Sequence, residues 1–130
     1  EVIIFKGIGQ LEIPKNMLLF IFGDNDIKKS QAIIRDESNT IGIPTKKIPN
    51  YLADSYYYDK DFVENKLKID LAILKILNAI ETKNYSGIIL PEDGFGTGLA
   101  NLNKNALITL EYINNEIIIL TEKIKKMLVC

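Results

Sequence analysis

Short, continuous apolar runs bounded by glycine or proline recur along this chain. Such runs are typical of strands that are buried on both faces, as in a parallel sheet. The runs predicted as strands are VIIF (2–5), MLLFIF (17–22), TIGI (40–43), GIIL (87–90) and EIIIL (116–120). Pro44 ends the run at 40–43, because proline cannot donate to a strand ladder.

Helical periodicity appears between these runs. Residues 61–82 are apolar nearly all round, with a narrow polar stripe made of Glu64, Lys68, Lys75, Asn78 and Thr82. Asp59 or Asp61 is placed to cap the start, and Glu64 with Lys68 has the spacing of an i,i+4 ion pair. Residues 103–115 are predicted as a second helix, and shorter helical pieces are predicted at 29–36 and 122–129.

The alternation of strands and helices predicts one α/β domain over residues 1–130. Its length suits a single hydrophobic core, and its sheet is expected to be mostly parallel with right-handed crossovers. In such sheets, ligands bind outside the carboxyl ends of the strands. The segments that leave those ends are GDNDIKKSQA after 17–22, PTKKIPN after 40–43 and PEDGFGTG after 87–90. We expect all three segments to line one crevice.

The residues of these segments indicate an anion site. Gly94, Gly96 and Gly98 alternate in the third segment, and a loop of this kind lets backbone N–H groups converge on an anion, most commonly a diphosphate. Lys46 and Lys47 in the second segment offer positive charge to the same anion. The crevice is therefore predicted to bind a phosphate-bearing ligand.

The first segment and a nearby tyrosine run add groups for the rest of such a ligand. Asp24 and Asn25 could hold a ribose or a base edge, and Tyr56, Tyr57 and Tyr58 could stack a base. Each feature also has an ordinary structural interpretation: a tight connection for the glycines, a turn for GDN, surface charge for TKK and a packing cluster for the tyrosines. Their joint placement on one edge favours the functional interpretation.

Composition removes several function classes. Sixteen basic and seventeen acidic residues give a net charge of -1, so no global field attracts nucleic acid or a membrane. Binding to nucleic acid would require a local patch, and we expect no membrane partner. The absence of histidine excludes a histidine triad, a histidine base and a histidine-ligated zinc, and we expect no metal or cofactor.

The ends of the chain bear on its compartment and its origin. Cys130 is the only cysteine, so no internal disulfide can form, which fits a reducing cytoplasm. No run reaches transmembrane length and no signal peptide opens the chain. Because the sequence starts at Glu1 and ends in apolar MLVC, we expect a piece of a longer polypeptide, truncated at the C-terminus.

Two motifs carry a family resemblance. GFGTGL fits neither a P-loop nor the dinucleotide fingerprint. However, IGIPTKK (41–47) followed by IILPEDGFGTGLANL (88–102) resembles the macrodomain family of ADP-ribose binders. The nearest branch holds the terminal ADP-ribose hydrolases and the antitoxin glycohydrolases that reverse DNA ADP-ribosylation. The chain is also similar to small uncharacterised phage and bacterial proteins beside that branch, and the resemblance spans about residues 17–120.

This resemblance implies a three-layer α/β/α sandwich with ADP-ribose at the carboxyl ends of the strands. Carried over by position, the implied ligand-binding residues are Gly23, Asp24, Asn25, Gln31, Thr45, Lys46, Gly94, Phe95, Gly96, Thr97, Gly98 and Leu99. Lys46 matches the lysine that attacks or polarises the anomeric carbon in this branch. The acidic partner of some hydrolases aligns with Gly98, and Asp93 is the candidate that replaces it because it lies close by in the sequence. The implied partners are a small nucleotide or an ADP-ribosylated macromolecule; the oligomeric state stays open.

Two departures from the family pattern separate binding from catalysis. KKSQA stands where relatives have a Gly-Gly pair after the first strand, and Gly98 stands where some hydrolases have an acidic residue. We therefore expect a module that binds ADP-ribose or a related nucleotide and sequesters a signalling molecule. The alternative is an ADP-ribosyl hydrolase acting on nucleic acid or protein, with Lys46 as nucleophile and an acid among Asp24, Glu92 and Asp93.

Overall fold

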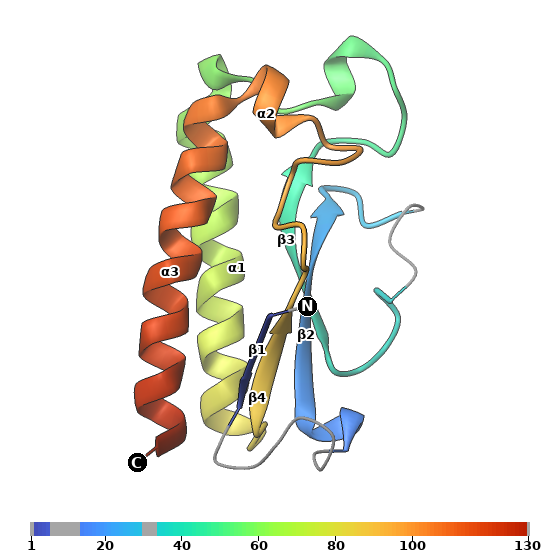
Figure 1. The fold of residues 1–130 in the computed structure, drawn as a ribbon. Helices are drawn as coiled ribbons and strands as arrows, with labels where there is room; N and C mark the ends of the chain where they lie inside the picture. Colours follow the sequence, from blue (N-terminus) through green and yellow to red (C-terminus); the bar gives the residue numbers. More distant parts are fainter. Residues whose placement is uncertain (1, 6–13, 30–33, 130) are drawn as a thin grey trace.

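The computed structural model describes residues 2–5, 14–29 and 34–129, and its class is mixed α/β (Figure 1). The strands are β1 (Val2–Phe5), β2 (Leu18–Asn25), β3 (Thr40–Lys46) and β4 (Gly87–Leu90). The helices are α1 (Phe62–Thr82), α2 (Leu102–Asn105) and α3 (Leu107–Val129), with short 3-10 helices at Lys15–Met17, Ala53–Ser55 and Asp59–Asp61. No helix among the described residues is long and apolar enough to cross a bilayer.

The four strands form one sheet in the order β1-β4-β2-β3. Strand β2 pairs in parallel with both β3 and β4, whereas β1 pairs antiparallel with β4 at the edge. The expectation of a mostly parallel sheet is therefore confirmed. The predicted strands at 17–22 and 40–43 are both longer at their carboxyl ends, so that β2 reaches Asn25 and β3 reaches Lys46.

Helices α1 and α3 lie side by side on one face of the sheet (Figure 1). Leu19, Ile21 and Ile43 face them and belong to one buried cluster with Ile69 and Ile76 of α1. The opposite face carries a small cluster formed by Leu18, Ile89 and Phe20. The α/β class is confirmed, and the third layer stays a prediction because both long helices of the described chain cover the same face.

The predicted strand at 116–120 is wrong, because EIIIL lies in the middle of helix α3. Three consecutive isoleucines suit a buried strand, but on a helix they spread around the axis. Ile117 packs on the core, while Ile118 and Ile119 are exposed. The core face of α3 is instead continued by Ile113, Leu120 and Ile124, which follow helical spacing across the run.

The other predicted helices are revised at their ends. The helix expected at 103–115 is divided, because the backbone breaks at Ala106 between α2 and α3. The helical tail predicted at 122–129 is confirmed as the end of α3. Of the piece expected at 29–36, residues 30–33 lie outside the described residues and residues 34–36 form turns.

The first turn of α1 differs from the predicted capping. Asp61 occupies the N-cap position of α1 but makes no side-chain capping bond. The Asp59 carboxylate instead accepts a hydrogen bond of 3.0 Å from the backbone N–H of Ile108 in the first turn of α3. Asp59 thus ties the starts of the two long helices together.

Replacing Asp59 with alanine should lower the free energy of unfolding by about 1 kcal/mol, because a helix start loses a side-chain acceptor. Asp61→Ala is the matched control. It removes a long contact of 3.5 Å to Lys47 and should cost less than about 0.5 kcal/mol. Urea unfolding of both variants measures the difference, and equal losses would contradict the role assigned to Asp59.

Candidate functional site

A cavity of about 200 Å³ lies where the chain leaves the parallel strands. Its walls come from the ends of β2 and β3 and from the loop after β4. The lining residues are Gly23, Asp24, Asn25, Thr45, Lys46, Gly96, Gly98, Leu99 and Ala100. The expectation that the three segments meet at one rim is confirmed. The ligand-binding role of these residues stays a prediction.

Lys46 is the unusual member of this lining. Its side chain sits at the end of β3 with 2% of its surface exposed, and its ammonium has no hydrogen-bond partner among the described residues. The nitrogen lies 4.7 Å from the ring centre of Tyr56 and 5.1 Å from that of Tyr51. These rings attract a cation but accept no conventional hydrogen bond from it. Burial lowers the pKa of Lys46.

The loop after β4 needs glycine for two different reasons. Gly94 and Gly96 have φ of 79° and 77°, a left-handed conformation that residues with a Cβ rarely adopt. At Gly96 there is also no room, since an added Cβ would lie 2.2 Å from Leu102 Cδ1. The Gly96 carbonyl accepts from the N–H of Leu102 at 2.7 Å, which closes the loop onto α2.

The same loop presents backbone donors. Residues 95–100 belong to no helix or strand. Within the described chain, their backbone N–H groups donate neither to a backbone carbonyl nor to a side chain. Phe95 is buried and anchors the loop, with its ring close to Gly23. The Thr97 hydroxyl donates to the Asp93 carbonyl across the turn. The loop is thus held by its carbonyls and its phenylalanine, which leaves amide hydrogens for an anion.

Asp24 and Asn25 were expected to offer polar groups to a ligand, and their side chains are instead engaged within the protein. Both carboxylate oxygens of Asp24 accept from the Arg35 guanidinium, whose pKa is raised by this hydrogen bond. The Asn25 amide donates to the Lys29 carbonyl at 2.6 Å and accepts from the Lys29 N–H at 3.2 Å. These two residues shape the rim after β2.

A second, larger cavity of about 480 Å³ adjoins the first, and Asp24 and Asn25 line both. Its apolar lining includes Phe22, Ile41, Pro44, Leu71 and Ala72, and its cationic lining is Lys28, Arg35, Lys68 and Lys75. Arg35, Lys68 and Lys75 were not predicted as site residues, because only the tertiary fold brings α1 and the 34–39 turns beside β3. Lys68 pairs with Asp26 at 2.7 Å, so its predicted pairing with Glu64 is wrong.

The tyrosine run serves packing more than stacking. Tyr57 is fully buried, its hydroxyl donates to Asp26, and burial raises its pKa. Tyr58 donates to the Ala53 carbonyl. Base stacking on Tyr57 is therefore excluded by its burial. The exposed ring near the cavity is Tyr51, which the sequence pattern did not single out and which lies over Lys46.

The remaining predicted residues lie apart from the smaller cavity or outside the description. Asp93 and Glu92 are exposed on the loop and do not line this cavity. Gln31 lies outside the described residues. No group of three or more potential metal-ligating side chains occurs among the described residues.

Comparison with known proteins gives one match. A family model described as a family of unknown function (DUF7831) matches residues 10–116. No curated protein and no solved structure matches the chain significantly. The matched residues include both strand ends, the glycine loop and Lys46, so the candidate site lies inside the part that defines the family.

Proposed function

The chain belongs to DUF7831, a family of unknown function, and we propose that it binds ADP-ribose or a related adenine nucleotide at the rim of its parallel strands. The observation that carries the proposal is the buried, unpartnered ammonium of Lys46 in the wall of a cavity. A buried cation without a hydrogen-bond partner is costly, and an anion in the cavity would remove that cost.

The neighbouring loop supports a phosphate as the anion. Four residues of the loop line the same cavity as the strand ends, and their backbone N–H groups donate to no acceptor within the described chain: Gly96, Gly98, Leu99 and Ala100. Converging amides and one charged amine are the donors that phosphate oxygens take in phosphate-binding loops. This combination favours a diphosphate over an apolar or cationic ligand.

Size decides how much of the ligand the smaller cavity takes. Pockets for drug-sized ligands occupy about 300–1,000 Å³, whereas this one has about 200 Å³. It therefore suits the phosphates alone. The rest of the nucleotide would extend past Asn25 into the adjoining cavity, whose apolar lining and cations suit a base with polar edges.

The motif resemblance to macrodomains supports the same ligand class. On this proposal the chain is a macrodomain-like protein of the three-layer type, and the described elements supply its sheet and one helical layer. A binding module of this kind would sequester a free signalling nucleotide or hold an ADP-ribosylated macromolecule.

Isothermal titration calorimetry tests the proposal with ADP-ribose, ADP and ribose 5-phosphate. ADP-ribose is expected to bind, and Lys46→Met should weaken binding at least about tenfold, which is the loss of one charge-assisted contact of roughly 1.4 kcal/mol or more. The matched control is Lys47→Met, because Lys47 is partly exposed and lies outside the cavity lining. Absence of binding by all three ligands to the wild type would overturn the proposal.

Affinity should also depend on pH in a defined direction. The protonated amine attracts phosphate, so wild-type affinity is expected to fall as pH rises through the lowered pKa of Lys46. The Lys46→Met variant lacks this fall. Titrations in matched buffers between about pH 7 and pH 10 measure it, and an identical slope in the two proteins would contradict the role given to Lys46.

A second candidate function, ADP-ribosyl hydrolysis, is favoured by the lowered pKa of Lys46, because a lysine attacks only as the neutral amine. Its nitrogen would bond to the anomeric carbon while the glycosidic bond breaks and the leaving group takes a proton from an acid. The attacking nitrogen would then lose a proton, and water would cleave the new C–N bond, which releases ADP-ribose and restores the lysine. Asp24 is the only carboxylate among the described lining residues of the smaller cavity, and Arg35 engages both of its oxygens. This arrangement favours binding over turnover.

Chromatography of ADP-ribosylated DNA and protein after incubation separates the two functions. Release of ADP-ribose that is lost in Lys46→Met would establish the hydrolase. Binding without release, even after prolonged incubation at high protein concentration, would establish the binding module.

A further inference from the structure

Strand β3 forms one edge of the sheet, and among the described strands it pairs with β2 alone. Just before β3, the Asn39 carbonyl accepts a hydrogen bond of 2.9 Å from the Phe20 N–H, and Phe20 lies beside Thr40 in the parallel register. Alternate residues of a parallel strand bond to the same neighbouring strand. The odd-numbered residues up to 43 therefore bond to β2, whereas the backbone groups of Thr40, Gly42 and Pro44 point away from the sheet.

These outward backbone groups have no hydrogen-bond partner within the described chain. An isolated bridge between Lys46 and Tyr56 covers this side of β3 only at its carboxyl end. Proline is tolerated in a strand where its missing N–H would face away from the ladder, which is the position of Pro44. Thr40 and Gly42 are partly exposed. An open edge of this kind pairs readily with the backbone of another extended chain.

The open edge of β3 borders the larger cavity, because all three outward residues line it. Another wall of this cavity is α1, which contributes Lys68, Leu71, Ala72 and Lys75. Leu71 is 60% exposed and Ala72 is buried, so the part of this wall between the two lysines is apolar. A groove between a strand edge and a helix suits an extended peptide, whose backbone pairs with the strand while alternate side chains contact the helix.

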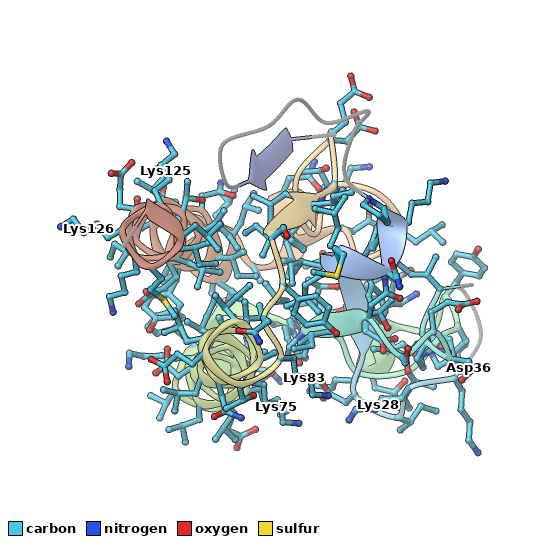
Figure 2. The ribbon with its side chains drawn as sticks, turned by 90° about the horizontal axis from the view of Figure 1, so that it is seen from below. Lys28, Asp36, Lys75, Lys83, Lys125 and Lys126 are labelled. Atoms are coloured by element: carbon cyan, nitrogen blue, oxygen red, sulfur yellow. The ribbon has the colours of Figure 1, made fainter. Side chains whose placement is uncertain are left out.

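Cations outnumber carboxylates in this groove. Its charged lining residues are Lys28, Arg35, Lys68, Lys75, Asp24 and Asp26. Arg35 and Lys68 each pair with one of the two carboxylates, whereas Lys28 and Lys75 have no ion-pair partner within the described chain. Figure 2 shows Lys75 on the side of α1 that faces Lys28 and away from α3. The unpaired charge favours an acidic peptide, and it disfavours a second copy of β3, which would bring the same lysines together.

We propose that β3 binds an extended acidic peptide of another protein. The peptide backbone pairs with the outward groups of Thr40 and Gly42, and its carboxylates face Lys28 and Lys75. The adenosine half of the proposed nucleotide would enter the same cavity, so peptide and nucleotide would exclude each other there. Peptide binding needs no nucleotide and is measured without it, so failure of one binding reaction is distinguishable from failure of the other.

Fluorescence polarisation of a labelled peptide of alternating valine and glutamate tests the site. The full chain should bind this peptide in the micromolar range, and a peptide of alternating valine and lysine at least about tenfold more weakly. Lys75→Glu should weaken binding of the glutamate peptide at least about tenfold. Lys126→Glu is the matched control, because Lys126 is exposed on α3 and lines neither cavity. Absence of binding by the wild type, or an equal loss in the two variants, would overturn the proposal.

Thr40 tests the strand pairing from the side of the protein. It is the first residue of β3, where proline is tolerated, and Thr40→Pro removes an outward N–H. Thr40→Val is the matched control, because both variants lose the hydroxyl that donates to the Glu37 carbonyl. Thr40→Pro should bind the glutamate peptide about three- to tenfold more weakly than Thr40→Val, the effect of one hydrogen bond. Equal affinities in folded protein, as judged by circular dichroism, would refute the pairing.

Backbone methylation of the peptide separates strand pairing from charge attraction. In an added strand, the N–H groups of every second residue face β3, and those of the residues between face away. One peptide is methylated at its valine nitrogens only and another at its glutamate nitrogens only, so that both keep the same charge. One of the two should lose binding at least about tenfold while the other keeps it. An equal effect of the two methylations would show that the peptide does not extend the sheet at β3.

Discussion

Gly96→Ala should lower the free energy of unfolding by about 2–5 kcal/mol. The new Cβ would lie 2.2 Å from Cδ1 and 2.6 Å from Cγ of Leu102, a side chain with no exposed surface and hence no room to retreat. Overpacking of this kind costs about 1–3 kcal/mol. The left-handed backbone at φ 77° adds about 1–2 kcal/mol for a residue with a Cβ.

The other glycines of the loop provide graded controls. Gly94 has φ of 79° but open space around its Cβ position, so Gly94→Ala should cost about 1 kcal/mol from conformation alone. Gly98 has open space and no positive φ, so Gly98→Ala should be neutral or stabilising by up to about 1 kcal/mol. Urea unfolding measures all three. A loss at Gly98 as large as at Gly96 would contradict the steric explanation.

Lys46→Met should stabilise the unliganded protein by about 1–3 kcal/mol at pH 7 while weakening nucleotide binding. The substitution keeps most of the side-chain volume and removes a buried ammonium that has no hydrogen-bond partner within the described chain. Such a gain in stability at the expense of binding is expected where a group is retained for its ligand. Lys47→Met, at a partly exposed site, should change stability by less than about 0.5 kcal/mol.

The stabilisation should depend on pH. Because burial lowers the pKa of Lys46 in the folded state, the unfolded chain binds more protons between that lowered value and the ordinary value of 10.5. Wild-type stability therefore gains with rising pH across this interval, whereas Lys46→Met has no such contribution. The gain in unfolding free energy of Lys46→Met over the wild type is therefore full below the pKa of Lys46 in the folded protein, and it disappears as the pH rises towards 10.5.

Unfolding of both proteins at pH 7 and near pH 10 isolates this effect, because the other titrating groups cancel in the difference. An advantage that stays constant across the range would show that the buried amine is not the cause.

The strands show how much of the fold can be predicted from the sequence. Apolar runs located β2, β3 and β4, since a buried strand must be apolar on both faces, and the parallel order then placed their following segments at one rim. The same criterion failed at 116–120, because three isoleucines fit a buried strand or a helix equally well. The segment is a helix because the core residues around it follow helical spacing, as Ile113, Leu120 and Ile124 show.

The candidate site divides in the same way. Its loop glycines and Lys46 are predicted from the segments that follow the apolar runs, and Thr45 is predicted only from the family resemblance. The hydrogen bonds of Asp24 with Arg35 and of Asn25 with Lys29 could not be predicted from the sequence, because they depend on which groups lie close together in space. For the same reason, the sequence did not predict the contact between Tyr51 and Lys46 or the ion pair between Lys68 and Asp26.

From the sequence alone follow an α/β chain, a glycine loop after one strand and a lysine at the end of another, because apolar patterning and backbone conformation are local properties. Three features depend on the three-dimensional fold: the Lys46 amine is buried without a hydrogen-bond partner in the described chain, Gly96 abuts Leu102, and the leucines of α1 face outward. Those features depend on which distant surfaces meet, and burial, sterics and desolvation act only between groups that have met.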